Sequence, residues 1–378
     1  MPTSRAKPIF AADRAATRTL VRWFGARRRG MPWRGPPGKP RDPYAVLVSE
    51  TMLQQTQVSR VMEKYGAFME RFPTVRALAA AHIDEVTALW AGLGYYRRAR
   101  NLHLAARMIV ERFAGIFPRD VESLLELPGV GRYTAGALVS IAFRRPAPVV
   151  DGNVQRVLMR LEGVDLEPAA NEAQQWVWRR AQELVVAATD AGEWNEGLME
   201  LGATVCTPRS PRCSACPLER LCVSRRDGTQ ASIPRPKPRK APKDLFHSVA
   251  LATDTRGRVL VEQRPPSGMW AGLWQAPTIE RPDRWATASE VKLAVGGTRA
   301  KTTAEFVFQT THRTVRVRVF RVSTTPRPAR GAFVPLGQVL DSGVSNLMKR
   351  VLVPADAPPP RNAAKSQRKT PGSRRGLV

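Results

Sequence analysis

The sequence of 378 residues has few cysteines, few acidic residues and no long apolar run. Its four cysteines are too sparse for the disulfide frameworks that stabilise small secreted proteins. It has no run of about 18 apolar residues, which a membrane-spanning helix would require. The N-terminal residues also lack the apolar segment of a secretory leader. We therefore expect a cytoplasmic bacterial protein with no membrane association, whose cysteines have a role other than disulfide formation.

Acidic residues are outnumbered by basic ones, with 60 Lys and Arg against 32 Asp and Glu and a net charge of +28. Such a charge favours a polyanionic partner, because bound lysine and arginine side chains release counterions from phosphates. A basic protein in which arginine is simply frequent is the alternative. The arginine-rich first twenty residues fit a plain cytoplasmic N terminus, with a transit peptide as the alternative. Composition thus points to nucleic acid.

A chain of this length should contain two or more domains. Apolar residues at helical spacing, such as Val58, Val61 and Tyr65, predict short helices in the first part. Period-two alternation at 248–253, 258–263 and 314–322 predicts strands in the second part. The expected segments are a helical domain at 10–223, a Pro-, Lys- and Arg-rich extended linker at 224–245, a second domain at 246–353 and a disordered basic tail at 354–378.

All the cysteines lie in one short loop with the spacing C-x6-C-x2-C-x5-C, formed by Cys206, Cys213, Cys216 and Cys222. Four thiolates in one loop suit a tetrahedral metal ion or an iron–sulfur cluster, and the spacing alone leaves zinc and iron–sulfur open. Arg209 and Arg212 lie inside the first arm, where we expect them to meet the DNA backbone.

A glycine-rich turn, Gly129-Val130-Gly131, separates two helical patterns. Two glycines around one apolar residue allow a tight turn whose backbone N–H groups point outward, and the following helix adds its positive dipole end. This arrangement would bind a DNA phosphate without reading sequence. An ordinary connection between helices is the alternative.

Two carboxylates stand out by their surroundings. Glu50 lies in an otherwise apolar helical segment, where burial would raise its pKa and let it donate a proton near neutrality. Asp151 directly precedes a helical segment from Val154 to Leu161 and would stay ionised if backbone amides hold it. An acid and an anion form a pair for cleaving a glycosidic bond. The alternatives are a solvent-facing Glu50 and an Asp151 that only caps its helix.

Together these motifs closely resemble the adenine DNA glycosylases, within the endonuclease III or helix-hairpin-helix superfamily of DNA glycosylases. The resemblance covers roughly residues 15–350 and rests on Met31–Arg34, Ser49–Val58, Leu93–Tyr96, Leu127–Gly136, Val150–Val154 and the cysteine loop. It implies a mainly α N-terminal helix-hairpin-helix glycosylase domain with a 4Fe–4S cluster loop at 206–222, followed by an α+β Nudix-like domain. It also favours iron–sulfur over zinc.

The resemblance implies roles for individual residues. In that family the residue matching Glu50 protonates adenine at N7, and the residue matching Asp151 stabilises the oxocarbenium-like sugar or traps it covalently. The residues matching Tyr133 and Asn153 support this site. Endonuclease III relatives that also cleave the strand carry a Schiff-base lysine at position 133. Because a tyrosine cannot form an imine, the resemblance implies hydrolysis by a monofunctional enzyme.

The target nucleotide must leave the base stack before its sugar bond can be reached. The resemblance implies that Gln55 and Tyr95 insert beside the base opposite the adenine, and Gln54 is expected at the same DNA surface. It implies a pocket for the flipped adenine formed by Trp33, Arg34, Leu53 and Glu196. A core aromatic is the alternative for Tyr95, next to a buried Tyr96, and a solvated helical face is the alternative for Glu196.

The segment Gln263–Trp274 resembles the start of the Nudix-like domain of this family. The glutamate-rich magnesium motif of Nudix hydrolases is missing, since Trp274 is followed by Glu280 and then Glu290 without the glutamate-rich helix. We therefore expect binding of 8-oxoguanine rather than hydrolysis. The recognition loop, usually Phe-Ser-His in the family, is Thr310, Thr311 and His312 here, and ordinary strand-end residues are the alternative.

The sequence thus predicts a monomeric adenine DNA glycosylase of base excision repair with a 4Fe–4S cluster. Its expected substrate is duplex DNA that contains adenine opposite 8-oxoguanine or guanine. A bifunctional glycosylase and lyase is one alternative. A non-catalytic DNA-binding module is the other, and the presence of both Glu50 and Asp151 argues against it. The cluster is expected to be structural, because two carboxylates can break the bond without it.

Overall fold

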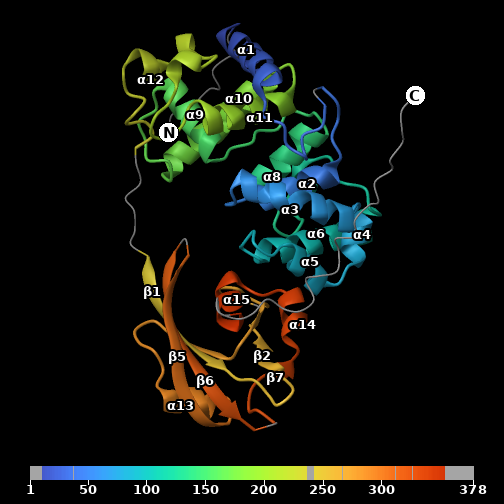
Figure 1. The fold of residues 1–378 in the computed structure, drawn as a ribbon. Coiled ribbons are helices and arrows are strands. Elements are labelled where there is room, and N and C mark those ends of the chain that lie inside the picture. Colours follow the sequence, from blue (N-terminus) through green and yellow to red (C-terminus); the bar gives the residue numbers. More distant parts are fainter. Residues whose placement is uncertain are drawn as a thin grey trace, which may run out of the picture. The chain divides into compact units, whose positions relative to one another are not determined.

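The computed structural model describes residues 11–36, 38–235, 242–265, 267–310, 312–325 and 327–353. It contains two compact units (Figure 1), a helical unit of Met1–Ala241 with Pro265–Gly272 and a mixed unit of Pro242–Arg264 with Leu273–Val378. A mainly helical first unit and a second unit of strands and helices are the predicted fold class. The predicted tail at 354–378 and the linker residues 236–241 lie outside the described residues.

The helices of the helical unit are short, and several begin at a capping side chain. Asp42, Asp120 and Asp190 each accept a hydrogen bond from a backbone N–H in the first turn that follows. The α-helices are α1 (Ala11–Arg27), α2 (Pro43–Leu53), α3 (Val58–Arg71), α4 (Val75–Ala80), α5 (Ile83–Leu89), α6 (Arg97–Phe113), α7 (Val121–Leu125), α8 (Arg132–Ala137), α9 (Gly152–Glu162), α10 (Asn171–Ala187), α11 (Ala191–Thr204) and α12 (Val223–Arg226). The π-helix η1 (Leu138–Ala142) continues α8, and the cysteine loop holds the 3₁₀ turns η2 (Cys213–Ala215) and η3 (Glu219–Leu221).

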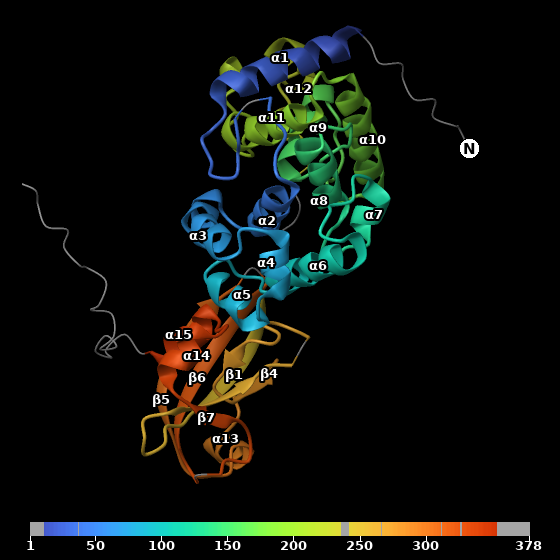
Figure 2. The same cartoon turned by 90° about the vertical axis from the view of Figure 1, so that its right-hand side faces the viewer.

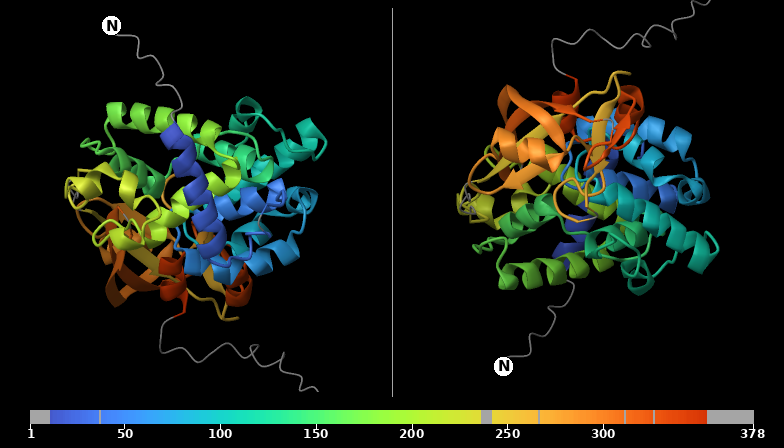
Figure 3. Two further views of the ribbon diagram at one scale, coloured as in Figure 1. Left: turned by 90° about the horizontal axis from the view of Figure 1, so that it is seen from above. Right: turned by 90° about the horizontal axis from the view of Figure 1, so that it is seen from below.

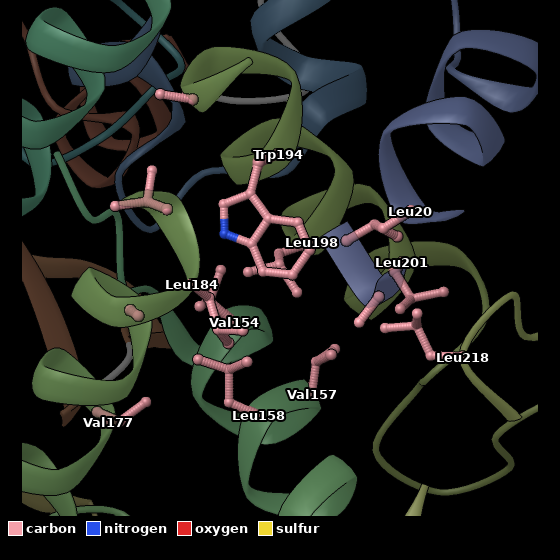
Figure 4. Close-up of a cluster of buried hydrophobic side chains, with 14 of the residues drawn as sticks. Leu20, Val154, Val157, Leu158, Val177, Leu184, Trp194, Leu198, Leu201 and Leu218 are labelled. Atoms are coloured by element: carbon pink, nitrogen blue, oxygen red, sulfur yellow. The ribbon is translucent and has the colours of Figure 1, made fainter. Parts of the chain in front are cut away.

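A core at one end of this unit joins α1, α9, α10 and α11. Trp194 of α11 is fully buried at its centre, and aliphatic side chains surround its ring (Figure 4). They come chiefly from Leu20, Val154, Val157, Leu158, Leu184, Leu198 and Leu201. Helix α1 packs on α10 and α11, as the view from above shows (Figure 3). This core fixes α9 and α11, which both reach the site described below.

The segment after α12 differs from the extended linker predicted from residue 224. Ile233 is buried in a small cluster with Met159 and Ala173. Its carbonyl accepts a hydrogen bond of 2.7 Å from Nε of Arg160. The buried Ile233, its hydrogen bond with Arg160 and the salt bridge of Arg235 with Asp165 attach this segment to the helical unit. A prediction based on proline and basic residues misses these contacts.

A four-stranded sheet in the order β4-β1-β6-β5 forms the main layer of the mixed unit (Figure 2). Strand β1 (Lys243–Leu251) runs parallel to β6 (Arg313–Thr324), while β4 (Thr278–Arg281) and β5 (Gly297–Gln309) pair antiparallel with β1 and β6. A second sheet has the order β3-β2-β7, from β2 (Val259–Gln263), β3 (Trp274–Gln275) and β7 (Ala332–Val334). The predicted strands overlap β1, β2 and β6.

Three helices complete the mixed unit: α13 (Ala288–Ala294), α14 (Leu336–Asp341) and α15 (Asn346–Leu352). Helix α13 packs on β1, β5 and β6, where Val291 joins Leu260 and Phe320 in a buried cluster. Alternate residues of β6, Val315, Val317 and Val319, are buried, as the period-two pattern predicts. Among the described helices, none has the length and apolar character needed to cross a membrane.

The close approach of α11 to the start of α9 depends on Gly202. A Cβ atom at this position would lie 2.6 Å from Cβ of Asn153. We predict that Gly202→Ala lowers the unfolding free energy of the helical unit by about 1–3 kcal/mol, because overpacking forces the two helices apart. Urea denaturation followed by circular dichroism measures this change. Gly66→Ala in α3 is the control, since nothing lies within 4 Å of its Cβ position. Equal losses in the two variants would contradict the prediction.

Candidate active site

A pocket of about 630 Å³ opens in the helical unit between α2, α8, α9 and α11. The structure brings both predicted carboxylates to its wall, together with most residues that the resemblance assigns to chemistry and base recognition. These are Trp33, Arg34, Glu50, Leu53, Gln54, Gln55, Tyr133, Asp151, Asn153 and Glu196. The pocket also contains residues that the sequence analysis did not select, among them Arg29, Met199 and Glu200.

Glu50 lies on α2, a helix that begins at Pro43 behind the capping side chain of Asp42 and is buried along most of its length. The Glu50 side chain accepts a hydrogen bond of 2.7 Å from the Tyr133 hydroxyl at Oε2. Burial raises the pKa of Glu50 to about 7, the Tyr133 hydrogen bond opposes this rise, and the negative charge of Glu196 adds to it. Glu50 is thus an acid that holds its proton close to neutral pH.

Asp151 lies at the N terminus of α9 and is its N-cap. Its Oδ1 accepts a hydrogen bond of 2.7 Å from the backbone N–H of Val154, and its Oδ2 accepts one of 2.8 Å from Nδ2 of Asn153. The helix dipole also favours negative charge at this position. Asp151 therefore caps α9 but does not only cap it, because it also lines the pocket.

Asn153 is itself held in place by Arg156, one turn further along α9. Nη2 of Arg156 donates to Oδ1 of Asn153 at 2.9 Å, and its Nε donates to the carbonyl of Cys206 at 2.8 Å. Because the amide oxygen of Asn153 is engaged, its Nδ2 faces Asp151. The supports of Asp151 therefore extend to the first residue of the cysteine loop.

Tyr133 connects α8 to the buried acid. Its hydroxyl lies 2.7 Å from Glu50 and 3.2 Å from Sδ of Met199. Burial and the neighbouring Glu50 carboxylate raise the pKa of Tyr133 well above its ordinary value, so the phenol stays neutral and acts as a hydrogen-bond donor. Among the described residues that line the pocket, none is a lysine.

Two buried glutamates on α11 are neutralised by three arginines. Glu196 accepts hydrogen bonds from Nε of Arg34 at 3.2 Å and from Nη1 of Arg41 at 2.9 Å. Glu200 accepts one of 2.6 Å from Nε of Arg29 and pairs with Nη2 of Arg34 at 3.0 Å. Burial alone would raise the pKa of Glu200, but the hydrogen bonds and charges of Arg29 and Arg34 outweigh it and lower this pKa. The solvated-face alternative for Glu196 is wrong, since its exposure is 4%.

The sequence reasoning missed Glu200, Arg29 and Arg41. A signal was present, because Glu196 and Glu200 are four residues apart and lie one above the other on a helix.

Trp33 is buried, and its ring meets Tyr65 edge-on at 5.4 Å between centroids. Leu53 is the last residue of α2 and lines the pocket.

Gln55 and Tyr95 occupy the loops that follow α2 and α5. Both have positive φ, 55° at Gln55 and 46° at Tyr95, a region that non-glycine residues seldom adopt. Tyr95 is 42% exposed while Tyr96 is 5% exposed, so the core alternative applies to Tyr96 and not to Tyr95. Gln54 is partly buried, and its amide donates to the Thr134 hydroxyl on α8 at 3.3 Å.

The glycine turn joins α7 to α8 as predicted. Gly129 has φ of 80°, and a Cβ there would lie 2.7 Å from Cβ of Asn101, so both the conformation and the space require glycine. Val130 is buried, and Gly131 is the N-cap of α8. Phosphate binding at this turn stays a prediction.

The four cysteines line one small cavity, together with Arg160 and Arg225. Burial raises the pKa of Cys216 to about 12, and the other three cysteines add to this rise. Nη1 of Arg160 lies 3.4 Å from Sγ of Cys206. A positively charged iron–sulfur core would stabilise the thiolates, and the donor set fits it. Arg209 and Arg212 are exposed, and Nη2 of Arg212 donates to the carbonyl of Thr204 at 2.7 Å.

The predicted 8-oxoguanine residues lie at the turn between β5 and β6. The Thr310 hydroxyl is 3.1 Å from the Arg313 carbonyl and 3.0 Å from its N–H, so Thr310 fixes the turn. His312 is exposed, and Thr311 lies outside the described residues. The recognition role of these residues stays a prediction.

Models of known protein families match three parts of the chain. Residues 48–183 match the HhH-GPD superfamily base excision DNA repair proteins, residues 206–222 match the iron–sulfur binding domain of endonuclease III, and residues 248–353 match the NUDIX domain. In a solved structure of a thermostable thymine-DNA glycosylase, 98% of that chain aligns with 57% of this one, at 30% identity and a TM-score of 0.51. The fold and site therefore define a DNA glycosylase of the helix-hairpin-helix class.

Curated relatives narrow this class. The human adenine DNA glycosylase is 35% identical over 88% of this chain and 72% of its own length. The adenine DNA glycosylase of Mycolicibacterium smegmatis is 46% identical over 53% of this chain and 66% of its own length. The chain belongs to the adenine DNA glycosylase family. Its cofactor is a 4Fe–4S cluster held by the cysteine loop, so the zinc alternative is set aside.

Tyr133→Phe tests the control of the buried acid. The variant removes the hydrogen bond that opposes the rise in the Glu50 pKa, so this pKa should move above about 7. Because an acid donates only when protonated, the alkaline limb of the pH–rate profile should shift to higher pH. Single-turnover cleavage across the pH range measures the shift. Tyr44→Phe is the control, because the Tyr44 hydroxyl donates to the Phe72 carbonyl outside the pocket. A limb that moves to lower pH would contradict the assignment.

Cys213→Ala tests the structural role of the cluster. We expect the variant to lose iron, to unfold at lower temperature and to bind DNA about tenfold more weakly, since the loop no longer presents Arg209 and Arg212. Iron content, thermal melting and fluorescence anisotropy with duplex DNA measure these effects. Ser214→Ala changes an exposed neighbour in the same loop and should behave like the wild type. Full stability and DNA affinity together with lost turnover in Cys213→Ala would contradict this role.

Proposed function

We propose that this protein removes adenine mispaired with 8-oxoguanine or guanine from duplex DNA, by hydrolysis of the N-glycosidic bond and without cleaving the strand. The observation that supports it most is the pair of unlike carboxylates in one pocket. Glu50 is buried with its pKa raised to about 7, whereas Asp151 accepts two hydrogen bonds at a helix N terminus. One group is suited to give a proton and the other to face a positive charge.

Glu50 acts as the general acid in this proposal. Protonation of the adenine ring at N7 turns the base into a better leaving group, because the electrons of the breaking C–N bond then enter a cationic ring. The Tyr133 hydroxyl fixes the orientation of the Glu50 carboxyl from 2.7 Å. Loss of this proton donor, as in Glu50→Gln, should cost roughly 10²–10⁴-fold in rate.

Asp151 stabilises the sugar as it acquires positive charge. Its two acceptor oxygens are held by Asn153 and by the backbone of Val154, so the carboxylate does not need to reorganise during the reaction. Attack of water, directly or after covalent capture of the sugar by Asp151, then completes hydrolysis. A Schiff base would require an amine, and the described pocket residues offer Tyr133 but no lysine.

The adenine pocket is proposed to consist of Trp33, Arg34, Leu53 and Glu196. The Arg34 guanidinium bridges Glu196 and Glu200, at 3.2 Å and 3.0 Å. This double contact fixes the guanidinium at the pocket wall, where its planar group suits a flat heterocycle. Glu196 and Glu200 thus differ from Glu50, because both are paired with arginines.

The Nudix-like unit is proposed to bind 8-oxoguanine through Thr310, Thr311 and His312 without hydrolysing nucleotides. Its two remaining candidate magnesium ligands have structural partners. Glu280 pairs with Arg264, and Glu290 forms a capping box with Thr287 and a salt bridge with Arg281. The hydrogen bond from Arg281, with those from Thr287, lowers the pKa of Glu290 to about 2.

We further propose that the protein acts as a monomer in the bacterial cytoplasm, where its DNA lies.

Release of free adenine from three duplexes tests the proposal. We expect release from duplexes with adenine opposite 8-oxoguanine or guanine, and none from an ordinary A·T duplex. The strand should break only after alkali, and borohydride should trap no covalent adduct. Failure of the cluster-loaded enzyme to release adenine from the 8-oxoguanine duplex would refute the proposal, whereas a borohydride adduct would favour the bifunctional alternative. Size-exclusion chromatography against the mass of 41.8 kDa tests the monomer.

A further inference from the structure

Two loops of the helical unit are held in a backbone conformation that costs free energy. Of the non-glycine residues with positive φ in the described chain, two are Gln55, after α2, and Tyr95, after α5. Such residues persist only when their surroundings hold them. The family resemblance gives these two side chains a common task, since it implies that both insert into the duplex beside the base opposite the adenine.

Arg98, in the first turn of α6, holds the first loop. Its Nη1 donates to the carbonyls of Thr51 at 2.8 Å, Met52 at 2.9 Å and Gln54 at 2.5 Å. These carbonyls belong to the end of α2, where a helix leaves its last acceptors without intrahelical partners. The guanidinium therefore caps α2 with a positive charge at the negative end of its dipole, directly before Gln55.

The other nitrogen of the same side chain holds the second loop. Nη2 of Arg98 donates to the carbonyls of Leu93 at 3.0 Å and Gly94 at 3.1 Å, directly before Tyr95. It also donates to the Thr56 hydroxyl at 3.0 Å, and this hydroxyl donates to the Leu93 carbonyl at 3.2 Å. One planar group and one hydroxyl thus join both loops.

Aromatic rings enclose the guanidinium. Its central carbon lies 5.4 Å from the centroid of the fully buried Trp90 and 5.6 Å from that of Tyr95. Trp90 also donates from Nε1 to the Gly94 carbonyl at 3.1 Å. Burial lowers the pKa of Arg98 to about 10, so the group still carries its charge at neutral pH. The site requires a cation that is flat and has two divergent donors, which is a property of arginine and not of lysine.

We propose that Arg98 is a positioning residue that sets Gln55 and Tyr95 at a fixed separation before DNA binds, so that both enter the duplex together. This inference rests on the proposed function and on the insertion that the family resemblance implies for these two residues. Arg98 hydrogen-bonds to Gln54 and Thr56 at the pocket wall but does not itself line the pocket. Its loss should therefore slow the unstacking of adenine and leave the chemistry of an unstacked adenine unchanged.

Arg98→Lys is the main variant, and Arg97→Lys, an exposed neighbour on the same helix, is its matched control. Single-turnover adenine release is measured on two DNAs: a duplex with adenine opposite 8-oxoguanine, and the same sequence with the adenine inside a small unpaired bubble. We expect Arg98→Lys to be slower on the duplex by about tenfold or more and to match the wild type on the bubble. Arg97→Lys should match the wild type on both.

Base unstacking is followed separately with 2-aminopurine in place of the adenine, in a Glu50→Gln background that slows excision by roughly 10²–10⁴-fold. The fluorescence rise on binding should be smaller with Arg98→Lys and unchanged with Arg97→Lys. Thr56→Val removes only the bridging hydroxyl and keeps Arg98, so it decides the matter if Arg98→Lys does not fold. Its expected effect is about fivefold on the duplex and none on the bubble.

Equal losses on duplex and bubble would overturn the inference, because a general structural defect lowers both. Unchanged rates on both DNAs in Arg98→Lys and in Thr56→Val would overturn it as well. A wild-type enzyme that releases adenine from neither DNA would instead refute the proposed function, so the two failures are distinguishable.

Discussion

The burial of negative charge in one pocket is the constraint on which the site depends. Three glutamates reach this pocket, and each buried carboxylate needs a cation, a hydrogen-bond donor or a proton. Glu196 and Glu200 receive arginines, namely Arg34, Arg41 and Arg29. Glu50 receives a neutral tyrosine hydroxyl. Because the cations are placed at the other two glutamates, the proton is most stable on Glu50, and the acid is defined as much by its neighbours as by its own burial.

The sequence predicts the two carboxylates of the pocket better than the residues that surround them. Glu50 was found because its helix is apolar, and Asp151 because it precedes a helix, so local pattern was sufficient for both. Glu200 and Arg29 were missed, since their pairing joins residues 171 positions apart in the chain. The attachment of Ile233 was missed for a similar reason, because its partners lie on α9 and α10. The sequence allowed the prediction of short-range patterns, while contacts between distant segments required the fold.

The alternatives weighed from the sequence were not always exclusive. Asp151 caps α9 and also faces the pocket, and the capping hydrogen bond is what keeps its carboxylate oriented. Of the two adjacent tyrosines, Tyr95 is exposed, as a residue that contacts DNA would be, and Tyr96 is the buried core aromatic. A functional group at a helix end gains orientation from backbone geometry that the fold needs anyway. Such a residue can therefore have a structural and a functional role at once, carried by different atoms or contacts.

In the loops that carry Gln55 and Tyr95, hydrogen bonds that stabilise the fold also hold the residues proposed to act on DNA. A left-handed conformation at a non-glycine residue costs on the order of 1–3 kcal/mol. Hydrogen bonds from a charged donor contribute about 1.5–3 kcal/mol each, and the Arg98 guanidinium makes several with the two loops. The hydrogen bonds from Arg98 thus offset the free-energy cost of the strained backbone in the free protein. Contacts with DNA do not have to offset this cost. A loop that is already ordered loses little entropy on association, so more of the interaction free energy remains available to unstack a base.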